Sequence, residues 1–138
     1  MAQEKLTESD ASRAYAKTIN TLDTTPLMPL LADDACYVAQ NVFDELKGKD
    51  EISDYLSETF KQSRRSKDMN LFAELALTRA YTFYAKNGEP CVRLAVGDKD
   101  NAVAVVLFEI KNDRIQKIEF CTFIPDPSTV ERSGDYPA

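Results

Sequence analysis

The sequence predicts an α+β domain in which two amphipathic helices come before a run of antiparallel strands. Apolar residues recur at helical spacing only in the first half of the chain, while the part after residue 68 consists of strand-like runs separated by turn signals. The length of 138 residues fits one domain. We therefore expect a single domain over residues 1–124 and a proline-containing coil tail over residues 125–138.

Helical spacing of apolar residues predicts the two main helices, at about residues 7–22 and 49–65. Thr7 and Asp10 fit a capping box at the start of the first helix. A short helix is expected at residues 24–31, where Pro29 limits its length. The long helix is expected to pack on the concave face of the sheet through one apolar stripe, which consists of Ile52, Tyr55, Leu56 and Phe60.

Strands are predicted from β-branched and aromatic runs, and their expected ranges are 36–39, 44–47, 69–85, 91–96, 102–110 and 115–124. Asn87-Gly88 and Asn112-Asp113 indicate turns, so the later strands form consecutive hairpins of one antiparallel sheet. The run at 102–108 is apolar at both alternating sets of positions, which predicts burial on both faces. A homodimer through the convex sheet face follows, with Val103 or Val105 at the interface.

Composition excludes several classes of function. The chain has no histidine, which excludes histidine-based nucleophile systems and histidine-ligated metal sites, and we expect no metal and no cofactor. The net charge of -6 argues against nucleic acid as a partner. No apolar run approaches the ~20 residues of a membrane helix. The chain has three cysteines, Cys36, Cys91 and Cys121, which lie far apart in the sequence and cannot all pair in disulfides. This predicts reduced thiols and a cytoplasmic location.

Two stretches resemble the nuclear transport factor 2-like superfamily, which is also called SnoaL-like. They are the sequence Leu-Leu-Ala-Asp-Asp-Ala at residues 30–35 and the Gly-Lys-x-x-Ile opening of the long helix at residues 48–52. The hairpin at 108–115 is also similar to the last hairpin of that family. The resemblance extends to about residue 124 and implies a cone-shaped, curved antiparallel sheet wrapped around the long helix, with an N-terminal helix, as in cystatin-like folds. Function stays open, because the superfamily includes isomerases, dehydratases, cyclases, hydrolases and non-catalytic binders.

The catalytic patterns of the well-understood members are incomplete in this chain. The similarity to ketosteroid isomerase matches its tyrosine with Tyr15, but matches its general-base aspartate with Ala39 and its second oxyanion donor with Val106. The similarity to limonene epoxide hydrolase matches an arginine with Arg93 and places Ala95 where an aspartate is needed. Neither alanine nor valine transfers a proton. We therefore assign no catalytic residue and expect no steroid isomerase activity.

The resemblance also implies a cavity between the helices and the concave sheet face. Its expected ligand-binding lining is Tyr15, Ile19, Tyr37, Tyr55, Phe60, Arg93, Val106, Phe108 and Phe120, with Ala39 and Thr122 beside them. These side chains either fill the core or leave a partly open apolar pocket. In the second case, the hydroxyls of Tyr15 and Tyr37 would orient a ligand.

Charged and polar residues near the strands have two interpretations each. Glu74, Arg79 and Arg93 either point to solvent or, if they point into the cone, pair with one another. Residues Gln40, Asn41 and Asp44 lie either at the cavity mouth or in a turn.

Three functions remain after this reasoning. The first is a domain that binds a small, largely apolar molecule. The second is an isomerase, dehydratase or hydrolase of a small apolar substrate that uses Tyr15 or Tyr37 with Arg93, Glu74 or Asp44. The third is a protein-interaction or dimerisation module. An apolar void near Tyr15 favours the first, a carboxylate within ~3 Å of a tyrosine hydroxyl in that void favours the second, and a closed core favours the third.

Overall fold

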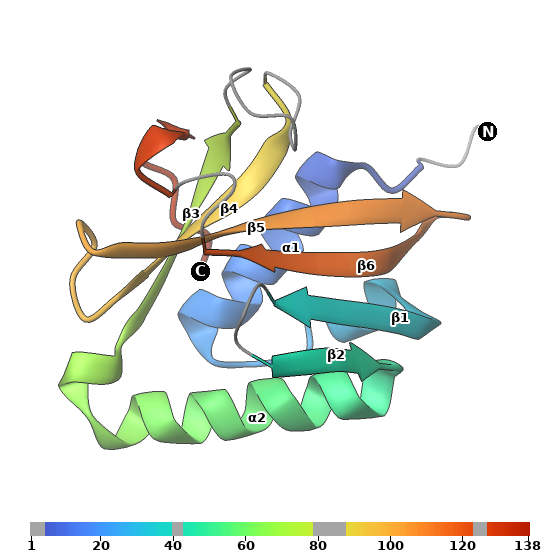
Figure 1. Cartoon of the computed structure of the whole chain (residues 1–138), viewed down its shortest axis with the longest axis horizontal. Coiled ribbons are helices and arrows are strands. Elements are labelled where there is room, and N and C mark those ends of the chain that lie inside the picture. The colour runs from blue at the N-terminus through green and yellow to red at the C-terminus, as the bar shows by residue number, and fades with distance from the viewer. Residues whose placement is uncertain (1–4, 40–42, 79–87, 123–126) are drawn as a thin grey trace.

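A computed structural model describes residues 5–39, 43–78, 88–122 and 127–138, and shows a curved sheet with two long helices on one side (Figure 1). The elements in chain order are α1 (Glu8–Thr21), η1 (Met28–Leu30), β1 (Leu31–Ala39), β2 (Phe43–Lys47), α2 (Lys49–Arg65), η2 (Lys67–Met69), β3 (Leu71–Leu77), β4 (Pro90–Val96), β5 (Ala102–Lys111), β6 (Arg114–Cys121), η3 (Pro127–Thr129) and β7 (Glu131–Arg132), where η denotes a 3-10 helix. The predicted α+β class is confirmed.

The described strands form one sheet in the order β2-β1-β6-β5-β4-β3-β7. The hairpins pair antiparallel, as predicted. However, β1 pairs with β6 in parallel, so the sheet is mixed rather than antiparallel throughout. This pairing joins the first and the last long strand side by side within the sheet. The two strands lie far apart in the sequence, and no turn signal between them could predict their pairing.

The helix limits follow from local chemistry. The capping box is present, because Thr7 N donates to Asp10 Oδ2 and Asp10 N donates to Thr7 Oγ1, both at 3.1 Å. At the start of α2, Gly48 has φ +89°, a conformation that favours glycine, and its N–H donates to the Ala35 carbonyl at 2.7 Å. The predicted long helix is thus confirmed, and its first turn lies against β1.

Strand limits differ from the predictions where the sequence signals are weak. The first strand begins at Leu31 rather than residue 36, because the 3-10 turn that contains Pro29 ends at Leu30. The strand predicted at 69–85 is β3 over Leu71–Leu77, and Met69 belongs to the 3-10 helix η2 instead. Residues 79–85, which include Arg79, lie outside the described residues, as does Asn87 of the predicted turn. Gln40, Asn41 and the side chain of Asp44 also lie outside them.

The sheet has an inner face, which the helices cover, and an outer face on the opposite side. Helix α1 crosses β3, β4 and β5, while α2 packs along β1 and β2. The inner core contains the buried stripe of α2, formed by Ile52, Leu56 and Phe60, with Tyr55 packed at its edge. The predicted packing of α2 is therefore confirmed.

Strand β5 is apolar on both faces because each face is buried by a different part of the same chain. Val106 belongs to the inner core, whereas Val105 and Leu107 form an outer cluster with Val130 from the C-terminal segment. Val105 is fully buried within one chain, while Val103 is 36% exposed. The observation behind the expected homodimer thus has an explanation in the monomer, and the homodimer itself stays a prediction.

The C-terminal segment is not the coil that the sequence predicts. Residues 127–129 form a 3-10 turn, and β7 pairs antiparallel with the outer edge of β3. The sequence does not predict this short strand, because the segment contains prolines and a two-residue strand carries no alternating pattern. None of the described helices is long and apolar enough to cross a membrane.

Candidate functional site

A cavity of about 320 Å³ lies between α1, α2 and the inner sheet face, and we call it the tyrosine pocket. Its lining is largely aliphatic and aromatic and consists of Tyr15, Ile19, Tyr37, Tyr55, Leu56, Glu58, Thr59, Gln62, Met69, Leu71, Leu94, Val96, Val103 and Phe120. Residues from both long helices, from the 3-10 helix η2 and from five strands thus meet around one space. Tyr15 borders this space, and its use as a ligand-binding pocket stays a prediction.

Two tyrosines are among the most buried lining residues, and we call their end of the pocket its base. Tyr15 lies on the buried stripe of α1, and Tyr37 lies on the inner face of β1. Their hydroxyl oxygens are 3.0 Å apart, and each residue is only 1% exposed. The ring of Tyr55, from α2, lies 5.5 Å from that of Tyr37. Two buried hydroxyls therefore satisfy each other at the base of an apolar pocket.

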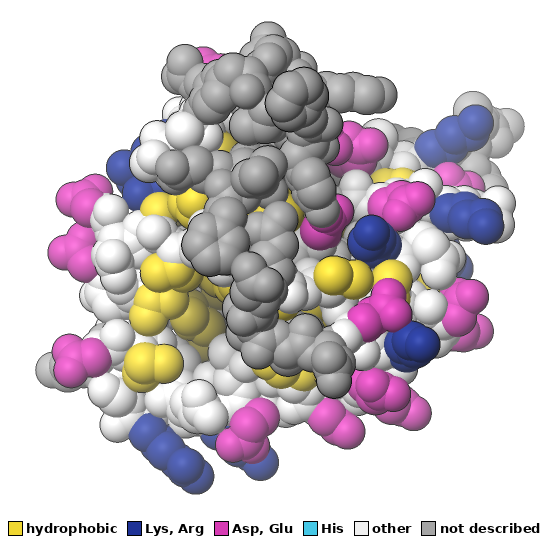
Figure 2. Space-filling view, in the orientation of Figure 1, with side chains coloured by type: hydrophobic (Ala, Val, Ile, Leu, Met, Phe, Trp, Pro, Cys, Tyr) yellow, Lys and Arg dark blue, Asp and Glu magenta, His cyan; other side chains and the backbone are white. Residues whose placement is uncertain are grey.

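The opposite end of the pocket reaches solvent. Met69 is 43% exposed and Val103 is 36% exposed, and the side chains of Glu58 and Gln62 lie on the surface of α2 beside them. Apolar side chains gather on this part of the surface, above α2 and below the β4–β5 turn, on the left in Figure 2. The mouth is therefore apolar, with polar groups at its edge.

Burial keeps the pocket tyrosines uncharged. Loss of hydration raises the pKa of Tyr15 and of Tyr37 well above 10, and also raises the pKa of Tyr55. The hydrogen bond from Tyr37 offsets part of the shift at Tyr15. A neutral phenol donates and accepts hydrogen bonds but is a poor base at neutral pH. The arrangement can therefore orient a carbonyl or hydroxyl of a ligand.

The predicted site residues divide into two groups. Tyr15, Ile19, Tyr37, Tyr55 and Phe120 line the pocket. The others lie elsewhere: Phe60, Val106 and Phe108 fill the inner core, Ala39 is buried on β1, and Thr122 is partly buried at the end of β6. Sequence reasoning missed the mouth, although Glu58, Thr59 and Gln62 continue the α2 stripe at helical spacing and could have been found.

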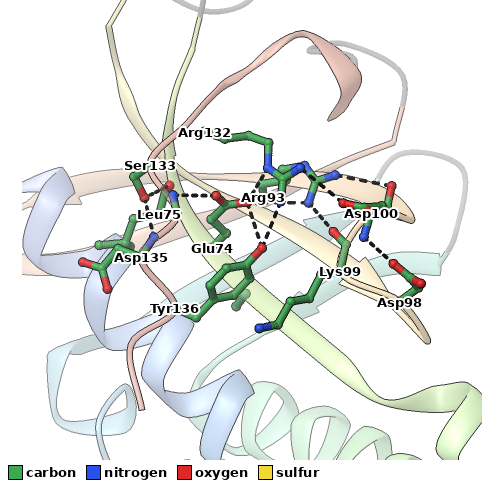
Figure 3. A network of polar contacts seen from close by, with 12 residues as sticks. Glu74, Leu75, Arg93, Asp98, Lys99, Asp100, Arg132, Ser133, Asp135 and Tyr136 are labelled. Carbon is green, nitrogen blue, oxygen red and sulfur yellow. Dashed lines mark hydrogen bonds and ion pairs between the residues drawn. The ribbon is translucent and has the colours of Figure 1, made fainter.

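Arg93 lies on the outer face, away from the tyrosine pocket. On β4, Val92 and Leu94 belong to the inner core, so Arg93 between them points to the opposite side. There it approaches Glu74 of β3, with Arg93 Nη1 3.6 Å from Glu74 Oε1. Contrary to the expectation from sequence, Arg93 therefore does not line the pocket. Nor do the two charges reach solvent, which was the other interpretation, because Glu74 is 1% and Arg93 5% exposed. They pair under the C-terminal segment, as Figure 3 shows.

A tyrosine hydroxyl does meet a carboxylate in this outer network. The hydroxyl of Tyr136 donates to Glu74 Oε1 at 3.2 Å. This pair lies on the other face of the sheet from Tyr15, beside the ion pairs that Glu74 makes with Arg93 and Arg132. The carboxylate that lines the tyrosine pocket is Glu58, at its exposed edge.

A second cavity, of about 290 Å³, lies between the start of α1, the ends of β3 and β4, and residues 131–133. Its buried polar side chain is Ser12, whose hydroxyl donates to the Glu8 carbonyl at 2.8 Å within the helix. Because this hydroxyl serves the helix backbone, the second cavity lacks the paired hydroxyls of the tyrosine pocket. We therefore take the tyrosine pocket as the candidate site.

Comparison with known proteins gives a likeness of fold. No family model matches the chain, and no curated protein matches it. An NTF2-like protein of unknown function from Cytophaga hutchinsonii superposes with a TM-score of 0.55 at 9% identity, covering 86% of this chain and 92% of the other. Bal32a, from a soil-derived mobile gene cassette, gives 0.56 at 18% identity, covering 89% and 95%.

A steroid delta-isomerase from Pseudomonas aeruginosa gives a TM-score of 0.55 at 15% identity, covering 84% of this chain and 80% of the other. Identities this low establish the fold and leave function open. The element order and the curved sheet agree with these structures and with the motifs at residues 30–35 and 48–52. The chain therefore has the nuclear transport factor 2-like fold that its sequence resembles.

Proposed function

We propose that this protein binds a small, largely apolar molecule in the tyrosine pocket. The observation that carries the proposal is the 3.0 Å pair of buried Tyr15 and Tyr37 hydroxyls at the base of an apolar pocket that opens at Met69 and Val103. Apolar walls supply the driving force for binding, and a few fixed polar groups set the ligand's orientation.

The expected ligand carries one hydrogen-bonding oxygen on an apolar body. A phenol or ketone fits, since its oxygen can accept from a neutral tyrosine hydroxyl while its body contacts the aliphatic and aromatic lining. An anionic group placed at the base would lose its hydration without a cation among the lining residues. Neutral compounds are therefore the first to test.

Binding without turnover is the form of the proposal that the site supports best. The positions that would supply a base and a second oxyanion donor in ketosteroid isomerase are Ala39 and Val106, and neither lines the pocket. The enzyme alternative based on Glu74 and Arg93 finds no support, since both lie on the outer face. The third alternative, a module that acts only through protein contacts, would need a closed core near Tyr15.

The test is equilibrium binding of a phenol and a ketone of matched size to wild-type protein and to Tyr15→Phe, together with native mass spectrometry of molecules that co-purify. We expect saturable binding that the variant weakens by about tenfold, the value of one hydrogen bond in an apolar site. Tyr136→Phe, which removes a hydroxyl on the outer face, should leave affinity unchanged. Absence of binding to wild-type protein would overturn the proposal, and equal binding to Tyr15→Phe would remove this tyrosine from the site.

A further inference from the structure

The end of the chain docks on β3 as an added strand. We call residues 131–136 the clasp, and the groove that holds them, formed by the edge of β3 with Glu74 at its base, the trough (Figure 3). Strand β7 pairs with Ala76 and Leu77. Beyond it, Ser133 N donates to the Leu75 carbonyl at 3.2 Å and Leu75 N donates to the Asp135 carbonyl at 2.9 Å. Backbone pairing of this kind is how sheets capture extended peptides.

One buried side chain recognises the clasp. Glu74 accepts from Gly134 N at 2.7 Å, from Arg132 Nε at 2.8 Å and from the Tyr136 hydroxyl at 3.2 Å. Gly134 has φ +79°, which favours glycine at that point. Three positions of the clasp thus carry specific requirements, namely an arginine, a glycine two residues later and a tyrosine two residues after that. Charge-assisted bonds of this kind give a peptide site its specificity.

The trough is built without the clasp. Arg93 pairs with Glu74, and Arg93 is itself held by the Lys99 carbonyl at 2.7 Å. Next along β3, the Asn20 side chain bonds both the N–H and the carbonyl of Ala73 at 2.8 Å. All these residues precede the clasp in the chain. The base of the trough is therefore organised by α1, β3, β4 and the β4–β5 turn.

The clasp is held by polar contacts more than by apolar burial. Its first five residues are exposed, and Arg132 retains 42% of its side-chain exposure while it contacts Glu74. The apolar anchors flank the clasp: Val130 before it is buried in the outer cluster, and Pro137 after it is also buried. A terminal segment with little buried apolar surface opens at lower free energy than the core. Release of the clasp therefore does not require the sheet to unfold.

We propose that the trough is a docking site for an extended peptide and that its occupant, besides the chain's own clasp, is the clasp of a second copy. The argument is chemical complementarity: the trough recognises an arginine, a glycine and a tyrosine at the spacing found in residues 132–136, and another copy carries the same segment. The tethered clasp competes at an effective concentration of about millimolar. Wild-type copies are therefore expected to exchange clasps only at comparably high protein concentration. The trough lies on the opposite face from the tyrosine pocket, so the inference is independent of the proposed function.

The first experiment titrates a fluorescent peptide of residues 130–138 into wild-type protein and three full-length variants, all checked for folding by circular dichroism. In Arg132→Ala the clasp is weakened and the trough is intact, so we expect saturable binding at least about tenfold tighter than to wild type. Glu74→Gln, with an altered trough, should bind at least about tenfold more weakly than Arg132→Ala. Arg114→Ala, which removes an exposed arginine on β6, should behave as wild type.

A peptide with Gly134→Val serves as the second control, because valine disfavours the left-handed backbone that the trough requires. It should bind Arg132→Ala at least about tenfold more weakly, and it keeps the test decisive if Glu74→Gln does not fold. If the native peptide shows no saturable binding to folded Arg132→Ala, or binds no better than the valine peptide, the trough is not a peptide site and the proposal is overturned. Should Arg132→Ala itself not fold, Tyr136→Phe takes its place.

The second experiment mixes isotope-labelled Glu74→Gln with unlabelled Arg132→Ala. Only the mixture contains an intact clasp and an intact trough, and they are on different copies. We expect a one-to-one complex of labelled with unlabelled chains by native mass spectrometry at submillimolar protein concentration, in excess of the labelled–unlabelled pairing that either variant shows when its own two isotopic forms are mixed. If the peptide binds but the mixture shows no such excess, the second copy is overturned as the occupant.

Discussion

The two faces of the sheet are covered by different means. On the inner face, α1 and α2 bury aliphatic and aromatic side chains, and the polar groups there are neutral tyrosines that bond each other. On the outer face, residues 127–137 cover a small apolar cluster and a buried carboxylate with two arginines. The inner face leaves a cavity beside its hydroxyls, whereas the outer face buries Glu74 and Arg93 and leaves Arg132 partly exposed.

This difference shows what each face can do. Burial of a neutral, hydrogen-bonded hydroxyl costs less free energy than burial of a charge, so a pocket can remain open beside the tyrosines. A buried carboxylate must keep its partners, because an unpaired charge in the interior costs several kcal/mol (roughly). The outer face therefore depends on the C-terminal segment, whereas the inner face depends on packing alone. A variant on the inner face should therefore lower the unfolding free energy through lost packing, and a variant on the outer face through lost charge pairing.

The largest effect is expected for Glu74→Ala. The change leaves Arg93, 5% exposed, without its carboxylate, and removal of one partner of a buried ion pair costs about 3–5 kcal/mol. Chemical denaturation at neutral pH measures the loss in unfolding free energy. The double variant Glu74→Leu/Arg93→Leu should recover part of it, since two apolar side chains remove the unpaired charge. A loss below about 1 kcal/mol would show that the network does not stabilise this face.

Phe60→Ala should cost about 3 kcal/mol on the inner face through lost burial and a residual cavity. Phe60 is 2% exposed on the α2 stripe. The matched outer-face variant Val130→Ala removes fewer buried carbons and should cost about 1–2 kcal/mol. Both values come from urea unfolding curves. A loss of only a few tenths for Phe60→Ala would contradict the packing of α2 described above.

Alkaline pH should act mainly on the inner face. Burial raises the pKa of Tyr37 well above its ordinary value of 10, so above pH 10 the unfolded chain loses a proton that the folded chain retains. The contribution of this group is complete below pH 10 and declines as pH rises toward the folded-state pKa. We expect wild-type protein to lose about 1.5 kcal/mol more stability than Tyr37→Phe between pH 10 and 11.5. Parallel pH profiles of the two proteins would contradict this.

A smaller effect is expected on the reactivity of the three thiols. Burial raises the pKa of Cys91 and of Cys121 to about 12, so at pH 8 both remain protonated in the outer cluster. Cys36 is only partly buried, although burial and a hydrogen bond with Glu45 also raise its pKa. Mass spectrometry after a short treatment with iodoacetamide should find modification at Cys36 first. Equal modification at Cys91 would show that the outer cluster opens readily.

No effect at all is expected in a steroid isomerase assay. Ala39 and Val106 replace groups that each contribute a factor of ~10²–10⁴, so turnover of a Δ5-3-ketosteroid should stay at background. The assay should include a binding measurement with the same steroid. Robust turnover would mean that a carboxylate reaches Tyr15 in solution, and it would favour the enzyme alternative.

Prediction from sequence succeeded where the signal is periodic and local. The stripe of Ile52, Leu56 and Phe60 identified the buried side of α2, and Thr7 with Asp10 identified the start of α1. Tyr15 and Tyr37 were placed beside the expected cavity by the resemblance to the nuclear transport factor 2-like fold, and their role in binding a ligand stays a prediction. Arg93 was misplaced, because the choice between the two faces of a strand depends on what covers the second face.

Local periodicity was enough to predict the fold class, both long helices and the apolar faces that meet in the core, because it is set among residues a few positions apart. The parallel pairing of β1 with β6, the contact of the tyrosine hydroxyls and the clasp on β3 became visible only in the folded chain. These contacts join residues that are 22 positions apart for Tyr15 and Tyr37 and 58 apart for Glu74 and Arg132. Their formation depends on strand register and on the path of the whole chain, which no local pattern records.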